Sequence, residues 1–197
     1  MRVVREQERK DQSAQLAACS KKYIVLSAHR EENIDNEKNF NSLMNAVNAV
    51  AEQYQMPIIF STHPRSRKQI EERGFVFNSL VKSIPPLGFN DYVNLQKNAF
   101  CVLSDSGTLS EESAMLNFPA VLIRTSTERP EAIDKGTITI GGITSTQILQ
   151  AISISQSTQH TNNITDYQDT NVSTKVIKII QSYTSIINHN VWRKQGV

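Results

Sequence analysis

The sequence predicts a protein of the α/β class, with a parallel sheet covered by helices on both faces. Short apolar, β-rich runs recur along the 197-residue chain, and helical stretches separate them. Alternating strands and helices are typical of βαβ units, whose strands run parallel. The runs are almost entirely apolar, as strands buried on both faces of a sheet require.

The elements follow one another without an internal repeat. The predicted strands are residues 23–28, 57–61, 81–84, 99–104, 120–123 and 137–140. The predicted helices are residues 39–53, 66–73, 91–98, 108–117 and 145–154. The residues that recur at helical spacing in the first helix are Phe40, Leu43, Met44, Val47 and Val50. Gly74 and Pro119 follow the second and fourth helices, as residues that end helices do.

Three segments are expected. Residues 1–22 form a linker or helix, residues 23–154 form a ligand-binding α/β domain, and residues 155–197 form a tail. The tail begins as a polar loop and continues as an amphipathic helix over residues 172–191. We expect this helix to pack away from its own sheet, against another domain or subunit.

The composition and charge of the chain disfavour several classes of partner. The net charge of +2 is too small to favour a nucleic-acid or membrane-surface partner. The basic residues near the N-terminus alternate with acidic ones, so they indicate a solvated helix face rather than a nucleic-acid arm. They are Arg2, Arg5, Arg9 and Lys10. The sequence shows neither a signal peptide nor an apolar run near the ~20 residues that span a bilayer.

The two cysteines, Cys19 and Cys101, lack the spacing of a metal site, so no metal is expected. Cys101 lies inside an apolar strand and is expected to be a small buried hydrophobic residue. Together with the absence of a targeting segment from the sequence, this cysteine usage favours a reducing, cytoplasmic location.

Polar motifs follow each of the first five predicted strands. They occupy residues 27–33, 61–65, 85–89, 105–108 and 125–131. The carboxyl ends of parallel strands meet at one edge of an open sheet, where ligands of such sheets bind. Five motifs that converge on one edge indicate a ligand site more strongly than any one of them does.

The motif Asp105-Ser106-Gly107-Thr108 predicts an anion site, because it joins an apolar strand to the start of a helix. Glycine lets the backbone approach a ligand closely. The free N–H groups and positive dipole end of a helix favour a phosphate or diphosphate. The sequence lacks GxGxxG, GxxxxGK[ST] and GxSxG, which disfavours a nicotinamide dinucleotide site, a P-loop ATPase and a serine hydrolase.

Several of these residues also have a purely structural interpretation. His29 can be a core or capping histidine, and Ser106 can cap its helix. His63 and Pro64 can end a strand and start a helix, with proline at the first helical position.

The charged residues have alternatives as well. Glu111 and Glu112 can complement the helix dipole. For Glu112 a ligand role is favoured, because a carboxylate one turn beyond a phosphate loop suits both hydroxyls of a ribose. Arg129 can balance diphosphate charge or pair with Glu128.

Taken together, the motifs resemble the C-terminal half of the non-hydrolysing UDP-N-acetylglucosamine 2-epimerases, in order and in spacing, over Tyr23 to Gly142. The residues that carry the resemblance are Ser27-Ala28-His29-Arg30-Glu31-Glu32-Asn33, Thr62-His63-Pro64, Asp105-Ser106-Gly107 with Glu111-Glu112, and Thr127-Glu128-Arg129-Pro130-Glu131. Thr108 stands where the commoner pattern has a second glycine, and the tail from Asn171 also departs from it. Both departures resemble the subgroup that converts UDP-2-acetamido-2,6-dideoxy-L-talose to the L-fucosamine nucleotide (the UDP-N-acetyl-L-fucosamine synthases) for capsule or O-antigen synthesis.

The resemblance implies a Rossmann-like domain that is one half of a GT-B-like two-domain enzyme, with the active site between the domains. The family's full chain is roughly twice as long, and its N-terminal domain carries most of the acidic residues for proton transfer. An enzyme of this kind is implied to be a homodimer in its full-length form and to need no cofactor. This chain alone is expected to bind UDP weakly and to lack epimerase activity.

Residue roles follow from the same resemblance. Ser106, Gly107 and Thr108 are assigned to the diphosphate, and Glu112 is assigned to the ribose. Leu87 and Tyr92 are assigned to the uracil, and Arg129 and His29 to the diphosphate–sugar region. Arg30 and His63 are assigned to a candidate regulatory UDP-sugar site. His29 is the candidate catalytic residue, by proton transfer or by charge stabilisation. The family usually has Gln and Phe where Leu87 and Tyr92 stand.

The implied reaction removes the C2 proton and expels UDP from C1, which leaves a 2-acetamidoglycal; UDP adds back after the proton returns on the opposite face. Two other function classes remain. One is the nucleotide-binding half of a GT-B glycosyltransferase, which transfer to an acceptor sugar would reveal. The other is a non-catalytic UDP-sugar-binding module that docks on a partner through its terminal helix.

Overall fold

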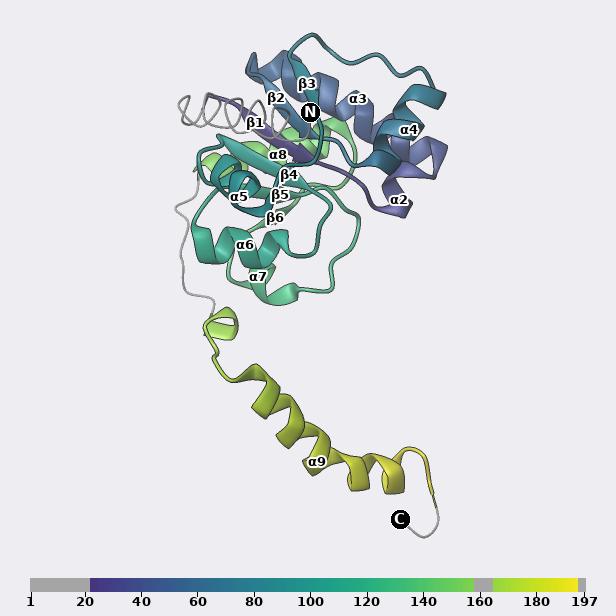
Figure 1. Ribbon diagram of the computed structural model, residues 1–197, viewed down its shortest axis with the longest axis vertical. Coiled ribbons are helices and arrows are strands. Elements are labelled where there is room, and N and C mark those ends of the chain that lie inside the picture. Colours follow the sequence, from purple (N-terminus) through teal and green to yellow (C-terminus); the bar gives the residue numbers. More distant parts are fainter. Residues whose placement is uncertain (1–21, 158–164, 195–197) are drawn as a thin grey trace, which may run out of the picture. The chain divides into compact units, whose positions relative to one another are not determined.

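The structure is a computed structural model that describes residues 22–157 and 165–194 (Figure 1). Two compact units are present, one ending at Ile164 and the other beginning at Thr165. The predictions for the N-terminal linker, its basic cluster and Cys19 fall on residues 1–21, outside the described residues. Part of the predicted polar loop, residues 158–164, also lies outside them.

The first unit is built on a parallel six-stranded sheet with the order β3-β2-β1-β4-β5-β6. The strands are β1 (Ile24–Ser27), β2 (Ile58–Ser61), β3 (Val81–Ile84), β4 (Cys101–Ser104), β5 (Ala120–Leu122) and β6 (Thr139–Ile140). Leu26 of β1 is in register with Phe60 on one side and with Leu103 on the other. The strand order reverses between β1 and β4, and the crevice at such a point is where open α/β sheets bind ligands.

Helices connect the strands. They are α2 (Glu31–Ile34), α3 (Glu37–Tyr54), α4 (Pro64–Glu72), α5 (Phe89–Lys97), α6 (Leu109–Leu116), α7 (Pro130–Asp134) and α8 (Ser145–Ser157). Helices α2 and α7 were not predicted, because four or five residues are too short to show a helical period. Helix α4 starts two residues earlier than expected, since Pro64 itself occupies the first helical turn.

Local sequence explains the limits of the longest helix of this unit, α3. The Asn36 side chain accepts a hydrogen bond from the N–H of Asn39 at 3.0 Å and caps the first turn. At the other end Gln55 adopts a left-handed conformation with φ 50°, which stops the helix before Pro57. The apolar stripe predicted from the sequence is the buried face of α3.

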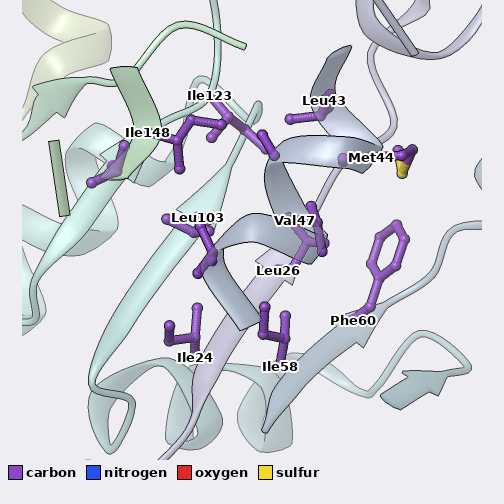
Figure 2. Close-up of a cluster of buried hydrophobic side chains, with 14 of the residues drawn as sticks. Ile24, Leu26, Leu43, Met44, Val47, Ile58, Phe60, Leu103, Ile123 and Ile148 are labelled. Carbon is purple, nitrogen blue, oxygen red and sulfur yellow. The ribbon is translucent and has the colours of Figure 1, made fainter. Parts of the chain in front are cut away.

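The core has two layers, one on each face of the sheet. On the first face, α3 and α8 pack on the sheet, and Figure 2 shows Leu43 and Val47 of α3 over Leu26 and Leu103. Successive strand residues point to opposite faces, so Val25 faces the second layer, with the other buried residues outside this cluster. The remaining buried apolar residues include Val102, Leu122, Leu95 of α5, and Leu109 and Ala114 of α6. The predicted sheet with helices on both faces is therefore confirmed.

One expectation about the strands is wrong. Strand β3 is only half-buried, with Lys82 and Ser83 exposed, because it forms an edge of the sheet. Strands β1, β2, β4 and β5 are buried along nearly their whole length, as the apolar runs predicted. Cys101 in β4 is fully buried, as expected, and burial raises the pKa of its thiol to about 12.

The second unit consists of a short 3₁₀ turn (Thr165–Tyr167) and helix α9 (Val172–Asn190). Helix α9 coincides with the predicted amphipathic helix and begins after Asn171, which is left-handed with φ 60°. Its apolar residues include Ile179, Ile180, Tyr183 and Ile187. Among the described residues, no helix combines the length and apolarity needed to cross a bilayer.

Candidate functional site

The polar motifs after β1 and β4 meet where the strand order of the sheet reverses. The turn after β1 carries His29 and Arg30, and the turn after β4 carries Asp105, Ser106 and Gly107. Since β1 and β4 are paired neighbours, with Ser27 beside Ser104, these two turns start at the same level of the sheet. The motifs that the sequence predicted to share one edge of the sheet therefore lie next to each other after β1 and β4.

Asp105 joins the two turns. The backbone N–H groups of His29 and Arg30 donate to its carboxylate at 2.9 Å each, and the side-chain amide of Asn33 donates at 3.2 Å. Asp105 is fully buried, and its own N–H donates to the carbonyl of Ser27 at 3.2 Å. The β1–α2 turn thus holds the negative charge of Asp105.

Gly107 lies beside two guanidinium groups. A Cβ atom placed on Gly107 would stand 2.8 Å from Nη1 of Arg129 and 3.6 Å from Nη2 of Arg30. These two cations come from loops far apart in the sequence, and they converge on the backbone that starts α6. Helix α6 adds the positive end of its dipole at this point. The arrangement suits an anion with more than one negative oxygen.

Arg129 settles one alternative left open by the sequence. Its Nε donates a hydrogen bond of 2.9 Å to Glu111 of α6 rather than to Glu128. Glu111 therefore does more than complement the helix dipole, because it sets the direction of the Arg129 side chain. Thr127 supports the same residue, since its hydroxyl accepts from the N–H of Arg129 at 3.1 Å.

Glu128 pairs instead with Arg124, in two parallel hydrogen bonds of 2.9 and 3.0 Å. Arg124 also donates to Glu32 at 2.9 Å, and only 3% of its side chain is exposed. Hydrogen bonds from Arg124, with a smaller contribution from the charge of Arg30, lower the pKa of Glu128. Arg124 thus ties the loop of Arg129 to the helix that follows His29.

Glu112 lies one turn into α6, next to α5. Its carboxylate accepts a hydrogen bond of 2.7 Å from the side-chain amide of the buried Gln96. Tyr92 of α5 is close enough for the charges of Glu112 and Asp105 to act on its phenol. Burial, with these charges, raises the pKa of Tyr92 to about 12, although a hydrogen bond with Ser27 opposes the shift. Glu112, assigned to the ribose, and Tyr92, assigned to the uracil, are therefore neighbours.

His29 and His63 lie side by side, with ring centroids 5.7 Å apart. The Nδ1 atom of His63 accepts from the N–H of Arg65 at 3.3 Å, so His63 caps α4. The structural interpretation of His63 and Pro64 is thereby confirmed. Arg30, assigned with His63 to a regulatory site, lies beside Gly107. The structure places the candidate catalytic and regulatory residues in one cluster.

Leu87 is half-buried in the loop between β3 and α5. Beside this loop lies an open hollow of about 320 Å³, lined by Thr62, Pro64, Pro85 and Pro86 together with residues of α4. Leu87 is therefore placed at the same edge of the sheet as the other motifs, on the side of β3.

The structure contradicts one further alternative. Ser106 does not cap α6, because the N-cap position belongs to Thr108; the hydroxyls of Ser106 and Thr108 lie 3.0 Å apart. Sequence reasoning also left three residues without a role: Asp105, Arg124 and Gln96. Asp105 and Arg124 are charged residues at the ends of apolar strands, which was the available signal; Gln96 had none.

Among residues 22–157 and 165–194, no group of three or more His, Cys, Asp and Glu side chains is arranged to hold a metal ion. The fold defines a Rossmann-like α/β domain of the GT-B type, with a candidate anion site at its topological switch point.

A family model described as UDP-N-acetylglucosamine 2-epimerase matches residues 2–181, so the chain belongs to this family. UDP-N-acetylglucosamine 2-epimerase of Methanococcus maripaludis is 35% identical over 166 residues, which are 82% of this chain and 45% of that protein. The solved structure of UDP-N-acetylglucosamine 2-epimerase from Rickettsia bellii is 36% identical with a TM-score of 0.67, covering 92% of this chain and 50% of the other.

A second structure, the Methanocaldococcus jannaschii UDP-GlcNAc 2-epimerase in complex with UDP-GlcNAc and UDP, is 28% identical with a TM-score of 0.72. It covers 90% of this chain and 50% of that one. The chain therefore spans about half the length of the relatives it matches.

Proposed function

We propose that this chain is the UDP-binding half of an enzyme that inverts C2 of a UDP-2-acetamido sugar. The observation that carries the proposal is that the guanidinium groups of Arg30 and Arg129 both lie beside Gly107, at the start of α6. A diphosphate fits this place because its two phosphates carry several negative oxygens, and each guanidinium can bind two of them.

The residues proposed to bind the ribose and the uracil lie progressively further from the diphosphate. Glu112, oriented by Gln96, accepts hydrogen bonds from the ribose hydroxyls. Tyr92 and Leu87 lie further along the same edge, on the α5 side, and take the uracil. Ser106 and Thr108 add hydroxyl donors on the diphosphate itself.

The reaction breaks and re-forms the bond between C1 and the diphosphate, while a proton leaves C2 on one face and returns on the other. The leaving group gains negative charge as the C–O bond breaks. Arg30, Arg129 and the N-terminal end of α6 lie together at this point before the reaction, and all three can stabilise this charge. His29, at the edge of the same cluster, is the candidate for a direct part in proton transfer.

The other groups needed for proton transfer are proposed to come from a second domain, in line with the half-length match to the relatives. The chain by itself is then expected to bind UDP without turnover. A 6-deoxy sugar as substrate and a role in capsule or O-antigen synthesis remain predictions from Thr108 and the tail. A cytoplasmic location and a homodimeric full-length enzyme also remain predictions.

Isothermal titration calorimetry of the 197-residue chain with UDP, UMP and ADP tests the proposal. We expect UDP to bind more tightly than UMP, because the second phosphate meets the two arginines, and more tightly than ADP, because the base pocket selects uracil. Equal heats for UDP and ADP would remove the uridine assignment. Absence of any UDP heat would remove the nucleotide site. Turnover of UDP-GlcNAc by the chain alone would contradict the need for a second domain.

A further inference from the structure

The carboxylate of Asp105 has a second neighbour besides the backbone of the β1–α2 turn. Its Oδ1 lies 3.4 Å from Nδ1 of the His29 ring. Asp105 is fully buried, whereas 40% of the His29 side chain is exposed. The ring therefore has one nitrogen facing a buried acceptor, and its other nitrogen lies on the opposite side of the ring.

We propose that Asp105 is a positioning residue for His29: it holds the imidazole with the proton on Nδ1, so that an unprotonated Nε2 is presented to the ligand side of the cluster. Its part in the reaction rests on the proposed function, but the tautomer itself does not.

The position of the carboxylate is fixed independently of the ring. Two backbone N–H groups, of His29 and Arg30, and the amide of Asn33 all donate to it. The N–H of His29 contacts both carboxylate oxygens, at 2.9 and 3.1 Å, which fixes the carboxylate relative to the same residue whose ring it faces. The acceptor is thus in place before any ligand binds.

The tautomer follows from the chemistry of the two groups. A carboxylate only accepts hydrogen bonds, and a neutral imidazole carries one N–H and one lone pair. With the proton on Nδ1, the ring offers its N–H to Asp105. With the proton on Nε2, the Nδ1 lone pair would face the buried carboxylate, and two acceptors in contact cost free energy. A distance of 3.4 Å allows this contact to tighten when a ligand closes the site.

The neighbouring histidine provides a contrast within the same cluster. The Nδ1 atom of His63 accepts a hydrogen bond from the N–H of Arg65, so its proton must be on Nε2. Two rings only 5.7 Å apart are therefore expected to be opposite tautomers. This difference comes entirely from the partner of Nδ1, a carboxylate in one ring and a backbone N–H in the other.

The test is a long-range ¹H–¹⁵N correlation spectrum of the chain with ¹⁵N-labelled histidine, without ligand, at alkaline pH where imidazoles are neutral. Spectra of His29→Gln and His63→Gln assign the two rings among the four histidines of the chain. We expect Nδ1–H for His29 and Nε2–H for His63. A proton on Nε2 of His29 in the unmodified chain would overturn the proposal.

The variant Asp105→Asn adds a second readout, because an amide can offer its N–H₂ to Nδ1. We expect the His29 proton to move to Nε2 while His63 stays unchanged; a folded variant that keeps Nδ1–H would also overturn the proposal. Asp134→Asn, the same change at an exposed residue of α7, is the matched control and should leave both tautomers as they are. If Asp105→Asn does not fold, the unmodified chain still decides. A chain with the expected tautomer but no UDP heat would refute the proposed function and leave this inference intact.

Discussion

The substitution Gly107→Ala should weaken UDP binding without lowering the stability of the fold. The added Cβ would stand 2.8 Å from Nη1 of Arg129, and the guanidinium must move by about 0.6 Å to reach the 3.4 Å at which ordinary contact begins. Arg129 has a long side chain, so we expect its guanidinium to move away from the position at which it would bind the diphosphate. Its ion pair with Glu111 is about one-third exposed on each side, and such pairs contribute little to stability.

The expected size of the effect follows from the hydrogen bonds that a displaced guanidinium can no longer donate to the diphosphate. A hydrogen bond to a charged group contributes about 1.5–3 kcal/mol. Every 1.4 kcal/mol is a factor of ten in affinity, so we expect UDP to bind about tenfold to a hundredfold more weakly. Stability should change in the opposite direction. Gly107 lies outside the left-handed region, and Gly→Ala at a compatible position stabilises by about 0.4–1 kcal/mol through the unfolded chain.

Calorimetry with UDP and a thermal melt followed by circular dichroism measure the two effects. Gly74→Ala is the matched control, because Gly74 has φ +58° and open space around its Cβ position, at the far end of α4. An alanine there is strained, by about 1–2 kcal/mol, so Tm should fall while UDP affinity stays unchanged. A Gly107→Ala variant that binds UDP within twofold of the unmodified chain would refute the placement of the diphosphate.

Three further variants test the surroundings of the site. Arg124→Met should lower Tm only slightly at neutral pH: the Arg124 pairing lowers the pKa of Glu128 and so stabilises the fold above the ordinary pKa of that carboxyl, but 60% of the Glu128 side chain is exposed and solvent weakens the pair. This contribution is lost as pH falls, and the two melting curves should converge in acid. Glu112→Gln should weaken UDP binding about tenfold and leave 2′-deoxy-UDP less affected, as calorimetry can show; equal losses for both would contradict the ribose contact. Burial raises the pKa of the Tyr92 phenol to about 12, so the stability that the protonated phenol provides persists below its usual pKa and is lost as pH rises toward 12. Tyr92→Phe should lack this loss and should remove one late-titrating phenolate from the ultraviolet absorbance; removal of a phenolate that instead titrates at the ordinary pKa of tyrosine would contradict the burial.

The sequence by itself determined the sheet, its longer helices and the edge that carries the candidate site. The stripe from Phe40 to Val50 repeats with the helical period, and that period is a property of the local backbone. The apolar runs of β1, β2, β4 and β5 predicted that these strands are buried, since both faces of such strands must be covered. Polar residues at the end of each run then predicted the candidate site, because parallel strands end at one edge.

Only the tertiary structure decided which polar groups meet. Asp105 and the N–H groups of His29 and Arg30 are more than seventy residues apart in the chain. Arg124 takes the carboxylate of Glu128, four residues on, and leaves Arg129 to Glu111 of another helix. Arg124 and Arg129 each have more than one carboxylate near them in the sequence, so composition and spacing could not show which ion pairs form. The choice depends on side-chain directions and distances of a few ångströms, which exist only once β1, β4 and β5 lie side by side.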